Sequence, residues 1–351
     1  MKNITMNYRS IGTLLNVLLL ALTMGFSITT PANEDSLYIS DGGDDTVKQF
    51  NAKTGKYLGN FVTPGNGGLH GPRGLIFIGD KLDVVNQNVG TPFNGEILQY
   101  RQNNGDFFAP LVSNTDPKPP FAPRGLLRGP GNTVYVADFD FVSGAVKQFN
   151  SRTGQWIANL DTTGFTNSTR LFIPRSIVRG PDDLLYVSVI GDLSANDVLT
   201  GYVLRFNPQN GKFVDVFTSH LASCATNPST HLHRPEGLVF GPDEKLYVTS
   251  FRADANDTDK VLILNGKTGK CLDEIDLDQV GGPRAFAQAI LFGPNGRLFV
   301  PINNTGEVRR YNVKTKTFNV FVPSAASSGP LQQPWYLTFG ETDPRTLEYD
   351  N

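Results

Sequence analysis

The 351-residue sequence has only two cysteines, three methionines, two tryptophans and four histidines, and it lacks several motifs that mark large enzyme classes. It contains no P-loop, GxSxG, HExxH or CxxC motif, so nucleotide hydrolysis, α/β-hydrolase chemistry, zinc-protease chemistry and dithiol redox chemistry lose support. The formal net charge is only −2. Because no overall charge favours a polyanion, we expect no nucleic-acid partner.

Long apolar runs are confined to the first 32 residues. Residues 11–28 are almost wholly apolar, Lys2 and Arg9 precede them, and small residues follow at positions 30–32. This order is typical of a cleaved secretory signal peptide. The alternative is an uncleaved membrane anchor, for which a run of about 18 residues is at the lower limit. We predict a signal peptide over 1–32, a single domain over 33–351, a secreted or periplasmic location and no stable membrane span after cleavage.

The two cysteines are Cys224 and Cys271, and export would permit a disulfide between them. The strand pattern described below places Cys224 after an outermost strand at one face. It places Cys271 at the start of the next outermost strand, near the opposite face. A strand of six or seven residues spans about 20 Å, whereas a disulfide needs Cα atoms within about 7 Å. The sequence therefore argues against this bridge.

Thirty-six glycines and 23 prolines indicate frequent tight turns, and these turns belong to a repeat. Residues 123–160 contain four short apolar or alternating runs, at 125–128, 134–137, 145–149 and 156–160. A turn at 150–154 separates the last two runs and ends in a glycine, which tolerates positive φ. The same order of runs recurs in units that begin at Pro72, Pro174, Pro235 and Gln288, and the turn recurs at Asn51, Asn207, Asn265 and Asn312.

The two ends of the repeat array complete each other. Residues 37–41 match the second strand of a unit, and residues 334–340 match a first strand. Closing the ring with these segments protects the sheet edges. The sequence therefore predicts an all-β fold, a six-bladed β-propeller with four antiparallel strands per blade. The C-terminal strand should close the ring by joining the N-terminal blade.

The units resemble NHL repeats, most clearly over residues 123–150, with Pro-x-Gly before the first run, Tyr-Val-x-Asp in the second and Asn-x-x-Thr-Gly in the hairpin. The wider group includes the senescence-marker (gluconolactonase-like) and streptogramin-lyase-like six-bladed propellers. The resemblance extends over about residues 37–340. It implies the fold. It implies no single activity, because this fold hosts binding proteins, lactonases, lyases and scaffolds.

In such propellers, ligand and catalytic sites usually lie on the face where first strands begin. The residue just before each first strand should ring the channel mouth. This ring consists of Arg73, Arg124, Arg175, Glu236, Gln288 and Trp335. Guanidinium groups grip carboxylates or phosphates bidentately, so one interpretation is an anion-binding mouth. The alternative is structural pairing of each arginine with carbonyls or acidic groups of adjoining blades, such as Asp41 and Asp138.

A second candidate site combines His231, His233 and Glu236, with His70 joining from another blade. Histidine and carboxylate bind divalent metals, and histidine serves as a general base near neutral pH. Glu236 lies in a Pro-Glu-Gly context like the metal-binding glutamate of gluconolactonase-like proteins. It falls in the fifth blade, however, and the partner Asn and Asp are not evident. The alternative is a hydrogen-bonded loop pair.

Two further features remain. The acidic loop at 254–259 offers oxygens for Ca²⁺, but its spacing does not fit an EF-hand, and a solvated loop is the alternative. Asn167, Asn256 and Asn303 begin glycosylation sequons.

The leading hypothesis for function is a secreted propeller that binds a small anionic ligand or a protein partner without catalysis. The rival is a metal-dependent lactonase, hydrolase or lyase that uses Glu236 with His231 or His233 and one divalent cation, Ca²⁺, Mg²⁺ or Zn²⁺. A third class is an interaction scaffold at the cell surface.

Overall fold

The computed structural model describes residues 35–350, apart from 91–92, 141–143, 167–169, 193–199 and 228–229. The chain divides into two units, Met1–Asn33 and Glu34–Asn351, and only the second contains described residues. The predicted signal peptide and Asn167 lie outside the described residues. No helix in the described ranges is long and apolar enough to cross a membrane.

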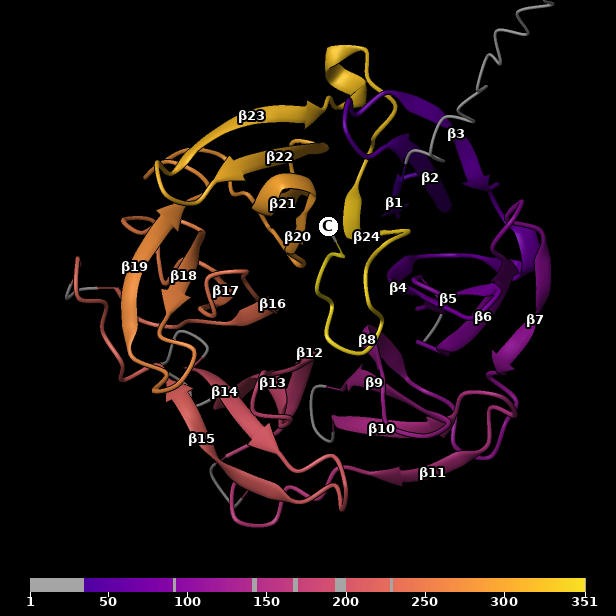
Figure 1. The fold of residues 1–351 in the computed structure, drawn as a ribbon, viewed down its shortest axis with the longest axis horizontal. Coiled ribbons are helices and arrows are strands. Elements are labelled where there is room, and N and C mark those ends of the chain that lie inside the picture. Colours follow the sequence, from indigo (N-terminus) through magenta and orange to yellow (C-terminus); the bar gives the residue numbers. More distant parts are fainter. Residues whose placement is uncertain are drawn as a thin grey trace, which may run out of the picture. The chain divides into compact units, whose positions relative to one another are not determined.

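The second unit is a six-bladed β-propeller whose blades are four-stranded antiparallel sheets arranged in a ring (Figure 1). The first blade contains β24 (Pro334–Phe339), β1 (Ser36–Asp41), β2 (Thr46–Asn51) and β3 (Tyr57–Val62). The second contains β4 (Pro72–Ile78), β5 (Lys81–Asn86), β6 (Glu96–Arg101) and β7 (Phe107–Val112). The third contains β8 (Ala122–Arg128), β9 (Thr133–Phe139), β10 (Ala145–Asn150) and β11 (Trp156–Asn159).

The fourth blade contains β12 (Ile173–Arg179), β13 (Leu185–Asp192), β14 (Thr200–Phe206) and β15 (Phe213–Ser219). The fifth contains β16 (Pro235–Phe240), β17 (Leu246–Ser250), β18 (Lys260–Leu264) and β19 (Cys271–Asp276). The sixth contains β20 (Leu291–Gly293), β21 (Arg297–Ile302), β22 (Glu307–Asn312) and β23 (Thr317–Val322). Three short 3₁₀ turns complete the described elements: η1 (Asn66–Gly68), η2 (Pro294–Gly296) and η3 (Ala325–Ser327).

The ring closes as the sequence predicts. β24 pairs antiparallel with β1, and Leu37 lies opposite Phe339 while Ile39 lies opposite Leu337. The innermost strand of the first blade therefore comes from the C-terminal end of the chain, and its other three strands come from residues near position 50. The fold prediction is confirmed, including the blade count and the closure.

The repeated hairpin has a local physical cause. The side-chain Oδ1 of Asn150 accepts hydrogen bonds from the backbone N–H groups of Arg152 and Thr153, at 2.9 and 3.1 Å. Gly154 then adopts φ 71°, a left-handed conformation that glycine enters without steric cost. Asparagine side chains stabilise such turns by mimicking a backbone turn. Asn51 and Asn265 accept both of these bonds, and Asn207 and Asn312 accept the bond from the residue two positions later.

Aromatic residues pack the blades against one another in a repeated pattern. Tyr186 on β13 contacts Phe217 on the outer strand of its own blade and Phe240 on the first strand of the next. The ring centroids lie 4.9 and 5.0 Å apart in edge-to-face geometry. Such pairs add about 0.5–1.5 kcal/mol each beyond area burial. Tyr38 and Phe299 occupy the equivalent position and make the same two contacts in their blades.

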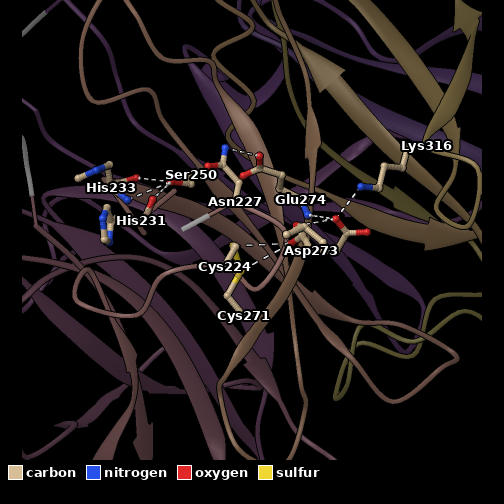
Figure 2. The surroundings of a disulfide bond; sticks show 10 residues. Cys224, Asn227, His231, His233, Ser250, Cys271, Asp273, Glu274 and Lys316 are labelled. Carbon is tan, nitrogen blue, oxygen red and sulfur yellow. Dashed lines mark hydrogen bonds and ion pairs between the residues drawn. A yellow bond between two sulfur atoms is a disulfide. The ribbon is translucent and has the colours of Figure 1, made fainter. Parts of the chain in front are cut away.

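The prediction against a Cys224–Cys271 bridge is wrong. The structure contains this disulfide, with the two Cα atoms 4.5 Å apart (Figure 2). Strand twist turns each outermost strand so that it runs along the circumference of the ring (Figure 1). The end of β15 consequently reaches the start of β19, rather than lying at the opposite face. The backbone N–H of Ala225 donates to the carbonyl of Cys271 at 3.3 Å, which places this connection alongside β19.

Small residues line the inner surface of the ring. A Cβ atom on Gly74 would lie 2.4 Å from the carbonyl oxygen of Arg124, and one on Gly237 would lie 2.7 Å from the Cα of Ala289. Adjacent first strands therefore approach one another closely around the channel. This geometry brings the residues that precede Gly74 and Gly237, which are Arg73 and Glu236, close to the channel axis.

Candidate functional site

The channel mouth gathers three buried arginines from three successive blades. Arg73 lies on β4, Arg124 on β8 and Arg175 on β12, each within the first three residues of its strand. Arg73 and Arg175 are 6% and 3% exposed, and the Arg124 side chain is 12% exposed. Charged side chains are almost never so deeply buried unless they are paired. The groups that contact these three arginines therefore indicate whether the cluster is structural or binds a ligand.

Aromatic rings hold the guanidinium planes. The Cζ of Arg73 lies 4.2 Å from the ring centroid of Trp335, and that of Arg175 lies 4.2 Å from the centroid of Phe139. Arg124 approaches the same Phe139 ring at 5.4 Å. These stacking contacts contribute about 0.5–2 kcal/mol each and leave the N–H edges available for hydrogen bonding.

Gly42, in the loop between β1 and β2, makes room for the Trp335 stack. A Cβ atom on Gly42 would lie 2.4 Å from the indole Nε1 of Trp335 and 3.2 Å from Nη1 of Arg73. A larger residue at this position would displace both side chains.

Glu236 is the only carboxylate that forms ion pairs within this cluster in the described part of the chain, and it is completely buried. Its Oε1 lies 3.4 Å from Nε of Arg234 and 3.7 Å from Nε of Arg175, and its Oε2 lies 3.6 Å from Nη1 of Arg124. Arg73 forms no ion pair among the described residues and donates from Nη1 to its neighbour's carbonyl, Pro72 O, at 2.9 Å. Four guanidinium groups and one carboxylate leave the cluster with a formal excess of three positive charges.

Gln288 and Trp335 complete the ring as the sequence predicts. The Nη1 of Arg124 donates to Oε1 of Gln288 at 2.6 Å, across the channel from β8 to the segment before β20. Trp335 contacts Arg73, as described above. The structure therefore brings all six predicted ring residues to one mouth.

The acidic partners that the structural alternative requires are engaged elsewhere. Asp41 lies 2.7 Å from the Lys48 Nζ and accepts hydrogen bonds from the backbone N–H groups of Gln332 and Gln333. Asp138 lies 2.8 Å from Lys147 and accepts from two backbone N–H groups of the preceding loop. Both carboxylates fix loops to strand ends. Among the acidic groups that the structure describes, Glu236 alone takes the structural role, and it does so for Arg124, Arg175 and Arg234.

Unpartnered polar atoms at the mouth are mostly donors. At the mouth, five buried donors of the described residues have no hydrogen-bond acceptor: Nε of Arg73, Nε of Arg124, Nε and Nη1 of Arg175, and the hydroxyl of Tyr336. Only one buried acceptor, Oε2 of Glu236, lacks a donor within this cluster. A buried polar group without a partner costs about 1–3 kcal/mol. An anion at this position would satisfy several of these donors at once.

Burial at the mouth also disfavours the charged forms of Arg73, Arg175 and Tyr336. Burial, with a smaller contribution from the neighbouring Arg124, lowers the pKa of Arg73 to about 9. Burial lowers the pKa of Arg175 to about 9 despite the opposing effect of Glu236. Burial raises the pKa of the Tyr336 hydroxyl to about 12. Because these pKa values are still above neutral pH, Arg73 and Arg175 remain protonated there, and a negative charge beside them would be stabilising.

Within the described residues, the histidine candidates belong to no group of three or more His, Cys, Asp or Glu side chains that could hold a metal ion. The rings of His231 and His233 lie 6.1 Å apart at a steep angle, and Ser250 Oγ contacts the backbone of both residues (Figure 2). The Glu236 carboxylate is enclosed by arginines instead.

His70 lies beside the β1–β2 loop. Its Nδ1 lies 2.8 Å from Oδ2 of Asp45, and its Nε2 contacts the carbonyl of Val89. The hydrogen bond with Asp45 is the main cause that raises the pKa of His70.

The carboxylates of the acidic loop have protein partners. Asp257 accepts from the backbone N–H of Ala253 at 2.8 Å and contacts Lys260. Asp259 pairs with Arg284 at 2.6 Å and accepts from the backbone N–H of Arg252. These contacts use the oxygens that a Ca²⁺ site at residues 254–259 would need.

Three residues of the mouth were not predicted from the sequence: Phe139, Arg234 and Tyr336. Each is adjacent to a residue that the repeat singles out, Asp138, Pro235 and Trp335 respectively. Their positions next to these repeat residues could therefore have identified all three as residues of the mouth.

The fold and mouth define a six-bladed propeller with a cationic channel entrance. No protein-family model matches the chain, and no curated protein matches it. Solved structures are similar in fold. A nidogen/laminin complex chain shares 14% identity with a TM-score of 0.59, covering 87% of this chain and 97% of that one.

Two further structures match at a similar level. A hydrazine synthase of Kuenenia stuttgartiensis shares 17% identity, with a TM-score of 0.54 and coverage of 79% and 73%. A virginiamycin B lyase of Staphylococcus aureus shares 15%, with a TM-score of 0.52 and coverage of 88% and 93%. At such identities the likeness establishes the propeller architecture alone. The sequence resemblance to NHL and gluconolactonase-like repeats thus extends to the architecture, and no family model supports closer membership.

Proposed function

We propose that this propeller binds a small anionic ligand at the channel mouth through Arg73, Arg124 and Arg175. The observation that supports this proposal is the imbalance of the cluster. Among the described residues of the mouth there are four guanidinium groups and one carboxylate, which pairs with three of them, and five buried donors lack acceptors. Arginine presents its N–H groups in a fork that matches carboxylate and phosphate oxygens. Trp335, Phe139 and Gln288 hold these forks in position.

We place this function in an oxidising compartment, outside the cytoplasm. The disulfide between Cys224 and Cys271 supports this location, because structural disulfides form and persist in secreted and periplasmic proteins. The apolar N-terminal run supports it as well. Thiol alkylation of the native protein, with and without prior reduction, tests the pairing by mass spectrometry.

Isothermal titration of the mature protein with inorganic phosphate, sulfate, acetate and succinate tests the binding proposal. We expect at least one of these anions to bind, with an affinity that falls as chloride is added. The Arg124→Met variant should bind about 10–100-fold more weakly, since a hydrogen bond to a charged group contributes about 1.5–3 kcal/mol. Arg152→Met is the matched control, because Arg152 is exposed on the outer hairpin of the same blade.

Two results would overturn the proposal. One is the absence of binding by every probe anion. The other is an equal loss of affinity in Arg124→Met and Arg152→Met, which would show that net charge, and not the mouth, attracts the anion.

A further inference from the structure

The segment after β24 crosses the channel at the end opposite the arginines. β24 begins beside the mouth at Trp335 and ends at Phe339, so the chain leaves it at the far end of the channel. Arg128, at the corresponding far end of β8, donates its backbone N–H to the carbonyl of Pro344 at 2.8 Å. In Figure 1 this C-terminal segment, drawn in yellow, lies over the centre of the ring.

Several contacts fix this segment. The backbone N–H of Gly340 donates to the carbonyl of Ser36 at 3.0 Å, and Thr342 forms an antiparallel bridge with Tyr349. The Tyr349 ring packs edge-to-face on Phe339 at 5.2 Å. The segment therefore forms a closed loop anchored to the first blade at both its ends.

Leu347 lies in this loop and enters the channel. It packs against four separate hydrophobic clusters of the propeller, which together include residues from all six blades. It also lines a cavity of about 40 Å³ together with Gly74, Gly125, Ser176 and Tyr336. This cavity lies one residue below the arginine layer, since Gly74 and Gly125 directly follow Arg73 and Arg124.

The backbone of Leu347 is strained in the conformation that places it there. Its φ is 60°, a left-handed value that costs a non-glycine residue about 1–3 kcal/mol. The hydrogen bond from its N–H to the carbonyl of Asp343, at 2.8 Å, closes the turn that holds this conformation.

We infer that Leu347 is a plug that closes the far end of the channel, so that the arginine layer is its only entrance. Part of this inference rests on the proposed anion site: a closed channel keeps water from reaching the guanidinium groups from below. Electrostatic attraction is stronger where water is excluded. Leu347 would thus be a positioning residue for anion affinity, although it touches none of the arginines.

A cysteine at position 176 reports closure independently of anion binding. Ser176 is buried and lines the cavity, and the native cysteines are both in the disulfide, so Ser176→Cys supplies the only free thiol. With Leu347 present, this thiol should react slowly with a small methanethiosulfonate reagent. In the Leu347→Gly background the rate should rise at least about tenfold, because thiol reactivity follows access. Leu347→Met keeps the plug and is the control.

Equal labelling rates in the Leu347→Gly and Leu347→Met backgrounds would overturn the plug, because the reagent would then reach position 176 without passing Leu347. If Leu347→Gly does not fold, as judged by circular dichroism, Leu347→Ala replaces it.

Anion titration of the same variants separates this inference from the proposed function. We expect Leu347→Gly to weaken binding of the probe anion about 3–10-fold, through faster dissociation, and Leu347→Met to leave it unchanged. If labelling shows a plug but no anion binds the wild-type protein, the plug stands and the proposed function fails. If anions bind equally to all variants while labelling changes, the link between plug and affinity fails.

Discussion

Replacing Arg73 with methionine should stabilise the protein in anion-free buffer and weaken its binding of anions. Arg73 is 6% exposed, forms no ion pair among the described residues, and has a pKa lowered to about 9 by burial and by Arg124. Methionine retains most of the apolar stem that packs near Trp335 and removes the buried charge. A purely structural arginine would show the opposite effect on stability.

The magnitude follows from these contacts. The fall of the pKa from 12.5 to about 9 corresponds to a cost of about 5 kcal/mol for the charged form. Methionine loses the stacking on Trp335 and the hydrogen bond to Pro72, together about 2 kcal/mol. The net gain is about 2–3 kcal/mol. For a folded unit of about 320 residues, this raises Tm by about 3–5 °C.

The pH dependence has a definite sign. Because the pKa of Arg73 is lower in the folded state, the cost of its charge is fully present below about pH 9. That cost declines as the pH rises from about 9 toward 12.5. The difference in Tm between Arg73→Met and the wild-type protein should therefore be constant from pH 6 to 8 and shrink above pH 9.

Differential scanning fluorimetry in a buffer without multivalent anions measures this difference. Arg152→Met, at an exposed hairpin position, controls for the loss of one positive charge and should leave Tm nearly unchanged. A lower Tm for Arg73→Met under these conditions would refute the reasoning, because it would show that the guanidinium stabilises the fold.

Three further predictions concern the disulfide, the ring closure and the buried carboxylate. Cys271→Ser should lower the free energy of unfolding by about 2–4 kcal/mol, measured by urea denaturation, and the reduced wild-type protein should match the variant. Deleting the residues after Gln333 should abolish cooperative unfolding of the whole ring in calorimetry, since it removes β24. A folded, cooperative product would contradict the closure argument. Glu236→Gln should destabilise the anion-free protein by about 3–5 kcal/mol, since it leaves buried guanidinium groups without their carboxylate. A saturating anion should recover part of this loss in thermal denaturation, and no recovery would count against binding at the mouth.

Most features that could be predicted from the sequence were predicted from its repeat. Its period determined the number of blades, and the match of residues 37–41 to a second strand determined how the ring closes. The hairpin at Asn150 was also predictable, because its asparagine and glycine act through bonds to neighbouring residues. The ring of mouth residues followed from one position in each unit, so symmetry alone placed Arg73 beside Arg124.

Tertiary structure decided the features that depend on distance across the ring. Twist accumulates from the innermost to the outermost strand, and it brought Cys224 to Cys271 where a flat sheet would have kept them apart. Asp41 and Asp138 turned to lysines and loop backbone rather than to the arginines. Leu347 enters the channel because the last segment folds back across it. A repeat specifies what each blade is, because its contacts are local. How the blades share one buried carboxylate and one plug depends on contacts between residues of different blades, which periodicity does not encode.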